Sequence, residues 1–282
     1  MTTGTIAITG ATGQLGQLAI AAIKLRAPEA NIIALARDPA RVEGTPARAF
    51  DYTKPETQVA ALAGVKTLVL ISSNDLDGNR AEQHRAVITA AKAAGVSRIV
   101  YTSILKVGAS PMILTQTHIV TEADLKASGI ATTVLRNGWY TENYTGTLQA
   151  AVEHGALIGS LGTGRISTAA RADYAEAIAV TALDDTHANK TYELAGDTAF
   201  TMQEFAAEVS AQAGKTIPYN SLPPATYAGI LQSFGLPEAL TVALADSDDH
   251  ASRGALLDES RTLSTLIGRP TTPIAATIKA AL

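Results

Sequence analysis

The chain has 282 residues, of which 46% are hydrophobic, and a formal net charge of −4 at pH 7. This composition allows a large buried core, which excludes a disordered chain. Lysine and arginine are scattered without a basic face, which excludes a nucleic-acid partner. The absence of cysteine excludes disulfides, thiolate nucleophiles and cysteine-ligated zinc.

Metal and membrane sites are not predicted either. The five histidines, at positions 84, 118, 154, 187 and 250, show none of the spacings of helical zinc motifs. The N-terminus lacks the charged start and long apolar stretch of a signal peptide. Because no apolar run is long enough to span a bilayer, we expect a cytoplasmic protein that does not bind membranes.

The first half of the chain alternates short apolar runs with longer amphipathic stretches. In chain order, the pattern predicts a strand at 5–9, a helix at 14–25, strands at 31–35 and 48–50, a helix at 55–62, a strand at 67–71, a helix at 80–94, a strand at 98–102, a helix at 115–128 and a strand at 132–135. This alternation is typical of an α/β fold, a Rossmann doubly wound parallel sheet with helices on both faces.

The second half is dominated by predicted helices, at 172–183, 202–212, 225–234 and 237–245, with short strands at 165–168, 192–194 and 217–219. We therefore expect a Rossmann domain over residues 1–140, with a later segment returning to its sheet. A smaller, mainly helical lobe over residues 141–282 would bind the substrate at the carboxyl edge of the sheet.

Three glycines, Gly10, Gly13 and Gly16, follow the first strand and open the first helix. Gly10 allows a tight turn, Gly13 lets backbone N–H groups approach a pyrophosphate, and Gly16 allows close helix packing. The G-x-x-G-x-x-G pattern alone is weak, but its place between a strand and a helix predicts a dinucleotide site. An ordinary glycine-containing loop is the alternative.

The second strand ends at Arg37 and Asp38, and residues at this point select the cofactor. An acid there binds the ribose 2′-hydroxyl of NAD, whereas an arginine accommodates the 2′-phosphate of NADP. Because a guanidinium matches phosphate geometry, Arg37 favours NADP(H). The alternative is that both residues are solvated loop charges.

Further stretches are shared with a known family, at 8–16, 51–52, 70–73, 101–103, 135–144, 171–174, 192–196 and 245–248. On these stretches the chain resembles the NmrA-like branch of the atypical short-chain dehydrogenase/reductases, and within it the type 2 NAD(P)H:quinone oxidoreductases. The Asn-Gly-Trp-Tyr stretch at 137–140 and the Ala-Asp-Ser-Asp stretch at 245–248 are the most specific.

The resemblance implies that the glycine turn wraps the pyrophosphate, that Arg37 holds the 2′-phosphate, and that later strand ends line the adenine, ribose and nicotinamide. The implied cofactor residues are Thr9, Gly10, Thr12, Gly13, Gln14, Leu15, Gly16, Arg37, Asp51, Tyr52, Ser72, Ser73, Tyr101, Thr102, Asn137, Gly138, Trp139 and Asn143. Ser72 and Ser73 could instead be strand-end caps. Trp139 and Tyr140 would contact the acceptor or, alternatively, pack in the core.

The Tyr-x-x-x-Lys pair of ordinary short-chain dehydrogenases is replaced here by His118 and Glu122, on one face of a predicted helix. His118, Ser103 and Tyr140 are the candidate catalytic residues. His118 could donate a proton or pair with Glu122 on the helix surface. Ser103 could polarise a substrate carbonyl.

The missing Tyr and Lys favour a quinone over a simple ketone. A hydroquinone anion is a weak base that takes its proton from water, so positioning matters more than a tuned acid. We therefore expect an NADPH-dependent reductase that transfers hydride directly to a quinone or similar planar aromatic small molecule, without flavin or metal. A homodimer through the helix at 115–128 is one arrangement that the sequence allows.

Two other functions fit the same residues. One is an NmrA-type regulator that binds NADP(H) and senses redox state without turnover. The other is a tailoring reductase or monooxygenase acting on a polycyclic quinone. Separately, Asp246, Asp248, Asp249 and His250 are close in sequence, and we interpret them as a helix-end network rather than a metal cluster.

Overall fold

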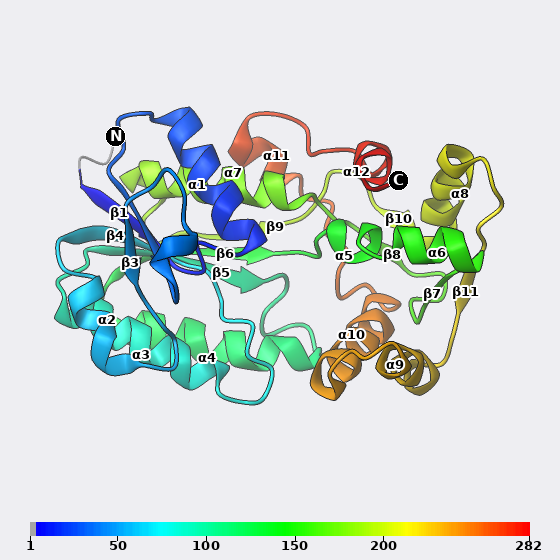
Figure 1. The fold of residues 1–282 in the computed structure, drawn as a ribbon, viewed down its shortest axis with the longest axis horizontal. Helices are drawn as coiled ribbons and strands as arrows, with labels where there is room; N and C mark the ends of the chain where they lie inside the picture. Colours follow the sequence, from blue (N-terminus) through cyan, green and yellow to red (C-terminus); the bar gives the residue numbers. More distant parts are fainter. Residues whose placement is uncertain (1–3) are drawn as a thin grey trace. The chain divides into compact units, whose positions relative to one another are not determined.

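The computed structural model describes residues 4–282. Its main feature is a seven-stranded sheet in the order β3-β2-β1-β4-β5-β6-β9 (Figure 1). The strands are β1 (Thr5–Ile8), β2 (Ile32–Ala36), β3 (Ala47–Ala49), β4 (Val65–Leu70), β5 (Arg98–Ile104), β6 (Ala131–Asn137) and β9 (Thr191–Leu194). The pairs linking β3 through β2, β1 and β4 to β5 are parallel. The predicted doubly wound α/β fold is confirmed.

Helices cover both faces of this sheet (Figure 1). On one face lie α1 (Gln14–Arg26) and α7 (Arg171–Leu183), which pack against each other. On the other face lie α2 (Pro55–Ala61), α3 (Arg80–Ala93) and α4 (Ile113–Ser128). Because helices cover β2 on both sides, all five of its residues are apolar and buried.

The chain forms two compact units. Unit 1 comprises residues 1–103, 117–136 and 171–192, and unit 2 comprises residues 104–116, 137–170 and 193–282. The chain therefore passes from one unit to the other more than once. A single domain boundary at residue 140 stays a prediction.

Unit 2 contains short strands and most of the remaining helices. Strands β8 (Arg165–Ile166) and β10 (Phe200–Thr201) pair antiparallel, and β7 (Leu157–Gly159) and β11 (Tyr219–Ser221) pair parallel. The helices are α5 (Glu142–Thr145), α6 (Leu148–His154), α8 (Met202–Ala213), α9 (Pro224–Ser233), α10 (Glu238–Ala251), α11 (Thr262–Ile267) and α12 (Ile274–Ala281). Two 3-10 turns, η1 (Pro39–Arg41) and η2 (Asp185–His187), belong to unit 1.

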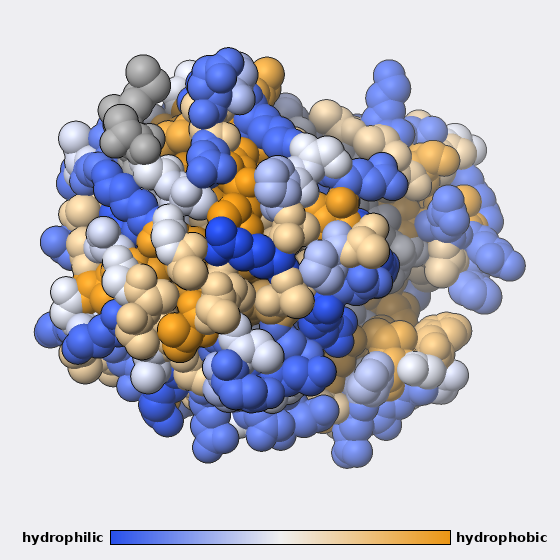
Figure 2. Space-filling model, turned by 60° about the vertical axis from the view of Figure 1, so that its left-hand side comes forward, coloured by the Kyte–Doolittle hydropathy of each residue, from blue (hydrophilic) through white to orange (hydrophobic). Residues whose placement is uncertain are grey.

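No helix within residues 4–282 has the length and apolarity needed to cross a membrane. The longest of them, α4, has 16 residues and carries charged side chains, whereas a membrane span needs about 20 apolar residues. On the face drawn in Figure 2, apolar residues are interspersed with hydrophilic ones.

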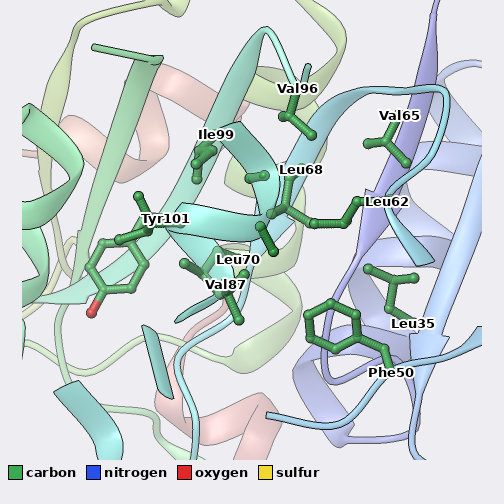
Figure 3. Close-up of a cluster of buried hydrophobic side chains, with 14 of the residues drawn as sticks. Leu35, Phe50, Leu62, Val65, Leu68, Leu70, Val87, Val96, Ile99 and Tyr101 are labelled. Carbon is green, nitrogen blue, oxygen red and sulfur yellow. The ribbon is translucent and has the colours of Figure 1, made fainter. Parts of the chain in front are cut away.

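The core of unit 1 between the sheet and α2 to α4 is built from branched aliphatic and aromatic side chains (Figure 3). Leu35, Leu62, Leu68, Leu70, Val87 and Ile99 are each fully buried there. Tyr101 lies at the margin of this cluster, and its hydroxyl points away from the apolar side chains. Packing in this core therefore holds β5 in place, and the Tyr101 hydroxyl is a polar group near the end of that strand.

Candidate functional site

The glycine-rich turn joins β1 to α1. Gly10 has a φ of +60°, a left-handed conformation that favours glycine, and its carbonyl accepts a hydrogen bond from the Gly13 N–H at 2.9 Å. A Cβ on Gly16 would lie 2.2 Å from the Gly10 carbonyl oxygen. A larger residue at position 16 would therefore force the helix away from the turn.

The first turn of α1 offers backbone N–H groups to a ligand. Its N-cap, Gly13, has no side chain to cap the helix, and the first turn contains no acidic residue. The first intrahelical bond runs from Gln17 N–H to the Gly13 carbonyl at 3.0 Å, so the N–H groups of residues 14–16 precede the helical ladder. Together with the positive end of the helix dipole, they suit an anion such as a pyrophosphate. The Leu15 side chain, in contrast, is buried.

Thr9 and Tyr52 connect the ends of β1 and β4. The Thr9 side chain is fully buried, and its hydroxyl oxygen accepts a hydrogen bond from the Ile71 N–H at 2.9 Å. The Tyr52 hydroxyl lies 2.8 Å from that same oxygen. Burial raises the pKa of Tyr52, so it is a neutral phenol. Both side chains therefore hold together the carboxyl ends of β1 and β4, next to the glycine-rich turn.

Arg37 and Asp38 follow the last residue of β2, and both are exposed. The Asp38 carboxylate accepts a hydrogen bond from the Ala40 N–H at 3.1 Å and caps η1. Arg37 makes no hydrogen bond or salt bridge within residues 4–282. The structure therefore gives Asp38 a local role and leaves the Arg37 guanidinium available to an anion.

Asp51 lies after β3, in the region influenced by Arg37. Its carboxylate accepts hydrogen bonds from the Thr53 N–H at 2.9 Å and the Thr53 hydroxyl at 2.8 Å. Burial acts to raise the pKa of Asp51, but the Thr53 hydrogen bonds and the charges of Lys54 and Arg37 outweigh it and lower the pKa. Asp51 is therefore an anion close to a cation, at the position predicted to border the adenine.

Ser72 and Ser73 follow β4 but differ in what their side chains do. The buried Ser73 hydroxyl donates to Gln83 Oε1 at 2.5 Å, and the Ser73 carbonyl accepts a hydrogen bond from Arg80 Nε. The Ser72 hydroxyl is half-buried and has no hydrogen bond in the described part of the chain. Ser73 therefore anchors the loop before α3, and Ser72 is the serine whose hydroxyl is available.

His84 is a buried residue of this network that the sequence analysis did not single out. The Ser73 N–H donates to its Nε2 at 2.9 Å, so the proton resides on Nδ1, which lies 2.9 Å from the Thr121 hydroxyl. Burial and the charge of Arg80 lower the pKa of His84 to about 3. The available signal was a polar side chain on the apolar face of a predicted helix.

His118 contacts Tyr101 rather than Glu122. Its Nδ1 lies 2.7 Å from the Tyr101 hydroxyl, and only 4% of its surface is exposed. Burial and then the positive charge of Arg80 hold the pKa of His118 well below its usual value. The imidazole is therefore neutral near pH 7, and the alternative of a surface histidine paired with Glu122 is wrong.

The end of β5 is tied to its neighbours through Thr102 and Ser103. The Ser72 N–H donates to the Thr102 hydroxyl oxygen at 2.9 Å. The Ser103 hydroxyl donates to Glu122 Oε1 at 2.6 Å, and Glu122 also binds Arg136. A serine has one hydroxyl hydrogen, so in this arrangement Ser103 does not offer it to a substrate carbonyl.

Asn137 ends β6 and begins a segment of unit 2. The backbone is fixed here, because its carbonyl accepts from the Leu105 N–H at 2.9 Å and the Gly138 N–H donates to the Leu194 carbonyl at 2.7 Å. The side chain is 3% exposed, and neither amide heteroatom has a partner among the described residues. An unpaired buried amide is costly, so a ligand able to donate and accept would relieve that cost.

The aromatic pair that follows belongs to unit 2. Trp139 is 8% exposed and is part of the apolar core of that unit. Tyr140 is half-buried and forms a parallel bridge with Ala169, and Asn143 lies in the short helix α5. Core packing of Trp139 is thus observed, while contact of either aromatic residue with an acceptor stays a prediction.

Two acidic residues of α10 bind backbone N–H groups of other segments of unit 2. Asp246 accepts a hydrogen bond from the Ile113 N–H at 2.8 Å, at the start of α4, and lies 3.4 Å from His250. Asp248 accepts from the Ser160 N–H at 2.9 Å, and burial raises its pKa to about 6. No group of three metal-ligating side chains occurs within residues 4–282.

Comparison with known proteins identifies the sequence family. A family described as NAD(P)H-binding matches residues 10–185. Quinone oxidoreductase 2 of Escherichia coli is 49% identical over 278 residues, covering 97% of this chain and 97% of that protein. The resemblance to the NmrA-like reductases is confirmed.

Solved structures agree with the sequence comparison. The NADPH-dependent quinone oxidoreductase of Escherichia coli in complex with NADPH has a TM-score of 0.93 and 49% identity, covering 98% of this chain and 99% of that one. The triphenylmethane reductase of a Citrobacter species in complex with NADP(H) has a TM-score of 0.92 and 34% identity, covering 98% and 100%.

Proposed function

This chain belongs to the NAD(P)H-binding family, and we propose that it is an NADPH-dependent reductase that transfers hydride directly to a quinone. The observation that carries the proposal is the near full-length similarity to an NADPH-dependent quinone oxidoreductase, at 49% identity and a TM-score of 0.93. The acceptor is a small planar aromatic molecule, and the reaction uses neither flavin nor metal.

The residues of unit 1 fit NADP(H). Gly10 and Gly16 leave the turn without side chains, as the 2.2 Å approach to the Gly10 carbonyl requires. The N–H groups at the start of α1 would hold the pyrophosphate. Arg37, exposed and without a salt bridge in the described chain, would hold the 2′-phosphate. The Ser72 hydroxyl would bind a ribose.

The chemistry needs little from a protein acid. Bound NADPH supplies the hydride, and the product hydroquinone anion is a weak base. His118 is buried and neutral, and the Ser103 hydrogen is directed to Glu122. The protein therefore mainly positions the reactants, and the hydroquinone anion takes its proton from solvent.

The test is turnover with a panel of simple quinones, followed by loss of the NADPH absorbance band. Steady oxidation with stoichiometric hydroquinone formation is expected. Tight NADPH binding without oxidation across the panel would contradict the proposal and favour a redox-sensing regulator.

A second substrate class is favoured by the same lack of a placed proton donor. When hydride adds to a triarylmethyl cation, a C–H bond forms and the charge is neutralised, so no proton is consumed. The triphenylmethane reductase that is 34% identical to this chain is named for such an acceptor. We propose that cationic triarylmethane dyes are also reduced. Hydroxide also adds to such cations at high pH, so decolorisation is measured where the dye stays cationic and against a control without enzyme. Absence of NADPH-dependent decolorisation by the chain under these conditions would refute this addition.

A further inference from the structure

The hydrogen of the Ser103 hydroxyl is already bound by a carboxylate. The hydroxyl donates to Glu122 Oε1 at 2.6 Å, and Ser103 is only 5% exposed. A hydrogen bond to a charged group is about twice as strong as one between neutral groups. A neutral carbonyl would therefore have to displace the stronger bond to receive this hydrogen.

Arg136 binds both carboxylate oxygens of Glu122. Arg136 Nε donates to Oε1 at 3.0 Å and Nη2 donates to Oε2 at 2.6 Å, which is a two-point guanidinium–carboxylate pair. An ionised carboxylate has no hydrogen to donate. Ser103 can therefore meet a further group only with the lone pairs of its oxygen.

The position of Ser103 is fixed by the sheet. The three residues come from β5, α4 and β6, all within unit 1. The strand order reverses between β1 and β4, and dinucleotides lie across the carboxyl ends of strands at such a point. With the adenosine beyond β2, the nicotinamide half is expected on the side of β4 and β5, and Ser103 lies one residue before the carboxyl end of β5.

We propose that Ser103 accepts a hydrogen bond from the nicotinamide nucleoside of NADP(H), and that Glu122 is a positioning residue that enforces this direction. The inference rests on the proposed function in that the cofactor is NADP(H). The matching donors on that nucleoside are the carboxamide N–H and the ribose hydroxyls. Because Ser103 orients the cofactor instead of polarising a substrate oxygen, the site disfavours simple ketones.

Binding of three nucleotides to the full chain tests the proposal without turnover. NADP⁺ carries both kinds of donor, its 3-acetylpyridine analogue lacks the carboxamide N–H, and 2′-phospho-ADP-ribose lacks the base. Loss of one hydrogen bond weakens binding by about 3- to 10-fold. If the carboxamide is the donor, Ser103→Ala weakens the binding of NADP⁺ by that factor and leaves the affinities for the other two nucleotides unchanged. If a ribose hydroxyl is the donor, all three weaken together.

Glu122→Gln tests the positioning role. In the variant an amide N–H replaces the Oε1 acceptor and donates to the Ser103 oxygen. The Ser103 hydrogen is then released from Glu122 and points towards the cofactor, where it opposes a donor. We expect Glu122→Gln to reproduce the ligand pattern of Ser103→Ala. The matched control is Asp124→Asn on the same helix, which removes a carboxylate paired with Arg85 at 3.0 Å and should leave all three affinities unchanged.

Two outcomes would overturn the inference. Unchanged binding of all three nucleotides to folded Ser103→Ala would show that Ser103 does not bind the cofactor. Weaker NADP⁺ binding in Ser103→Ala but not in Glu122→Gln removes the role of Glu122. Failure of the wild-type chain to bind 2′-phospho-ADP-ribose would instead contradict the proposed function, because that ligand carries the phosphate expected at Arg37.

Discussion

Replacement of Arg37 by alanine should reduce the preference of this chain for NADPH over NADH. Arg37 is exposed and has no salt bridge within residues 4–282, so the substitution should change the unfolding free energy by no more than about 0.5 kcal/mol. A hydrogen bond to a charged group contributes about 1.5 to 3 kcal/mol. Because solvent screens an exposed site, we take the lower end, which is about a tenfold weaker affinity for NADPH.

The assay is the dissociation constant of NADPH and of NADH for the wild type and for Arg37→Ala. NADH lacks the 2′-phosphate, so its affinity should stay within about twofold. Asp38→Asn is the matched control, because an asparagine oxygen can still accept from the Ala40 N–H. An equal loss of NADPH and NADH affinity in Arg37→Ala would refute the assignment.

Three further changes have expected outcomes. Gly16→Ala should lower the melting temperature and weaken NADPH binding, since its Cβ would lie 2.2 Å from the Gly10 carbonyl oxygen. Gly229→Ala is the control, because a Cβ at that position has no neighbour within 4 Å, and it should do neither. Equal effects of the two substitutions would contradict the turn geometry. Arg98→Met should destabilise the fold by about 3 kcal/mol in urea denaturation, because it removes hydrogen bonds to the carbonyls of Thr181, Ala182 and Asp184, and an unchanged midpoint would refute that role. Burial lowers the pKa of His84 to about 3 in the folded chain, so the stability that neutral His84 contributes is complete above pH 6.5. That stability is lost as the pH falls from 6.5 towards 3, by up to about 1.4 kcal/mol per pH unit. The difference in unfolding free energy between wild type and His84→Gln should therefore shrink over that range, and a constant difference would exclude the linkage.

The cofactor edge of the fold could be predicted because its signals are local. The strand and helix expected at 5–9 and 14–25 are observed at Thr5–Ile8 and Gln14–Arg26. The apolar run, the glycine spacing and the helical periodicity all lie within one short stretch of chain. The sequence already favoured Arg37 as the residue for NADP(H). The role of Asp38 needed the structure, because its capping bond to Ala40 depends on where η1 begins.

The polar contacts behind the site could not be predicted in the same way. Ser103, Glu122 and Arg136 are far apart in sequence and meet only when β5, α4 and β6 pack together. The i, i+4 spacing correctly placed His118 and Glu122 on one helix face, yet each binds a different partner. Periodicity predicts which residues share one face of a helix, whereas the side chains that they contact on a neighbouring strand are known only from the packing.

Tertiary contacts also override local preference in unit 2. The helix predicted at 237–245 extends to Ala251 through a run of aspartates that are poor helix formers. Asp246 and Asp248 accept hydrogen bonds from the Ile113 and Ser160 N–H groups, and Asp249 pairs with Arg253 at 2.7 Å. The partners of Asp246 and Asp248 are distant in sequence and are not visible in a local window, whereas Asp249 and Arg253 lie one helical turn apart. Together these bonds offset the weak propensity.

Direct hydride transfer from NADPH to a quinone is the central claim, and an isotope measurement tests it most directly. The chain would be mixed with NADPH deuterated at the transferred position and a simple quinone in a single turnover, without added flavin. Slower oxidation than with unlabelled NADPH, and complete conversion to hydroquinone, is the predicted result. No oxidation of bound NADPH until a flavin is added would contradict the claim.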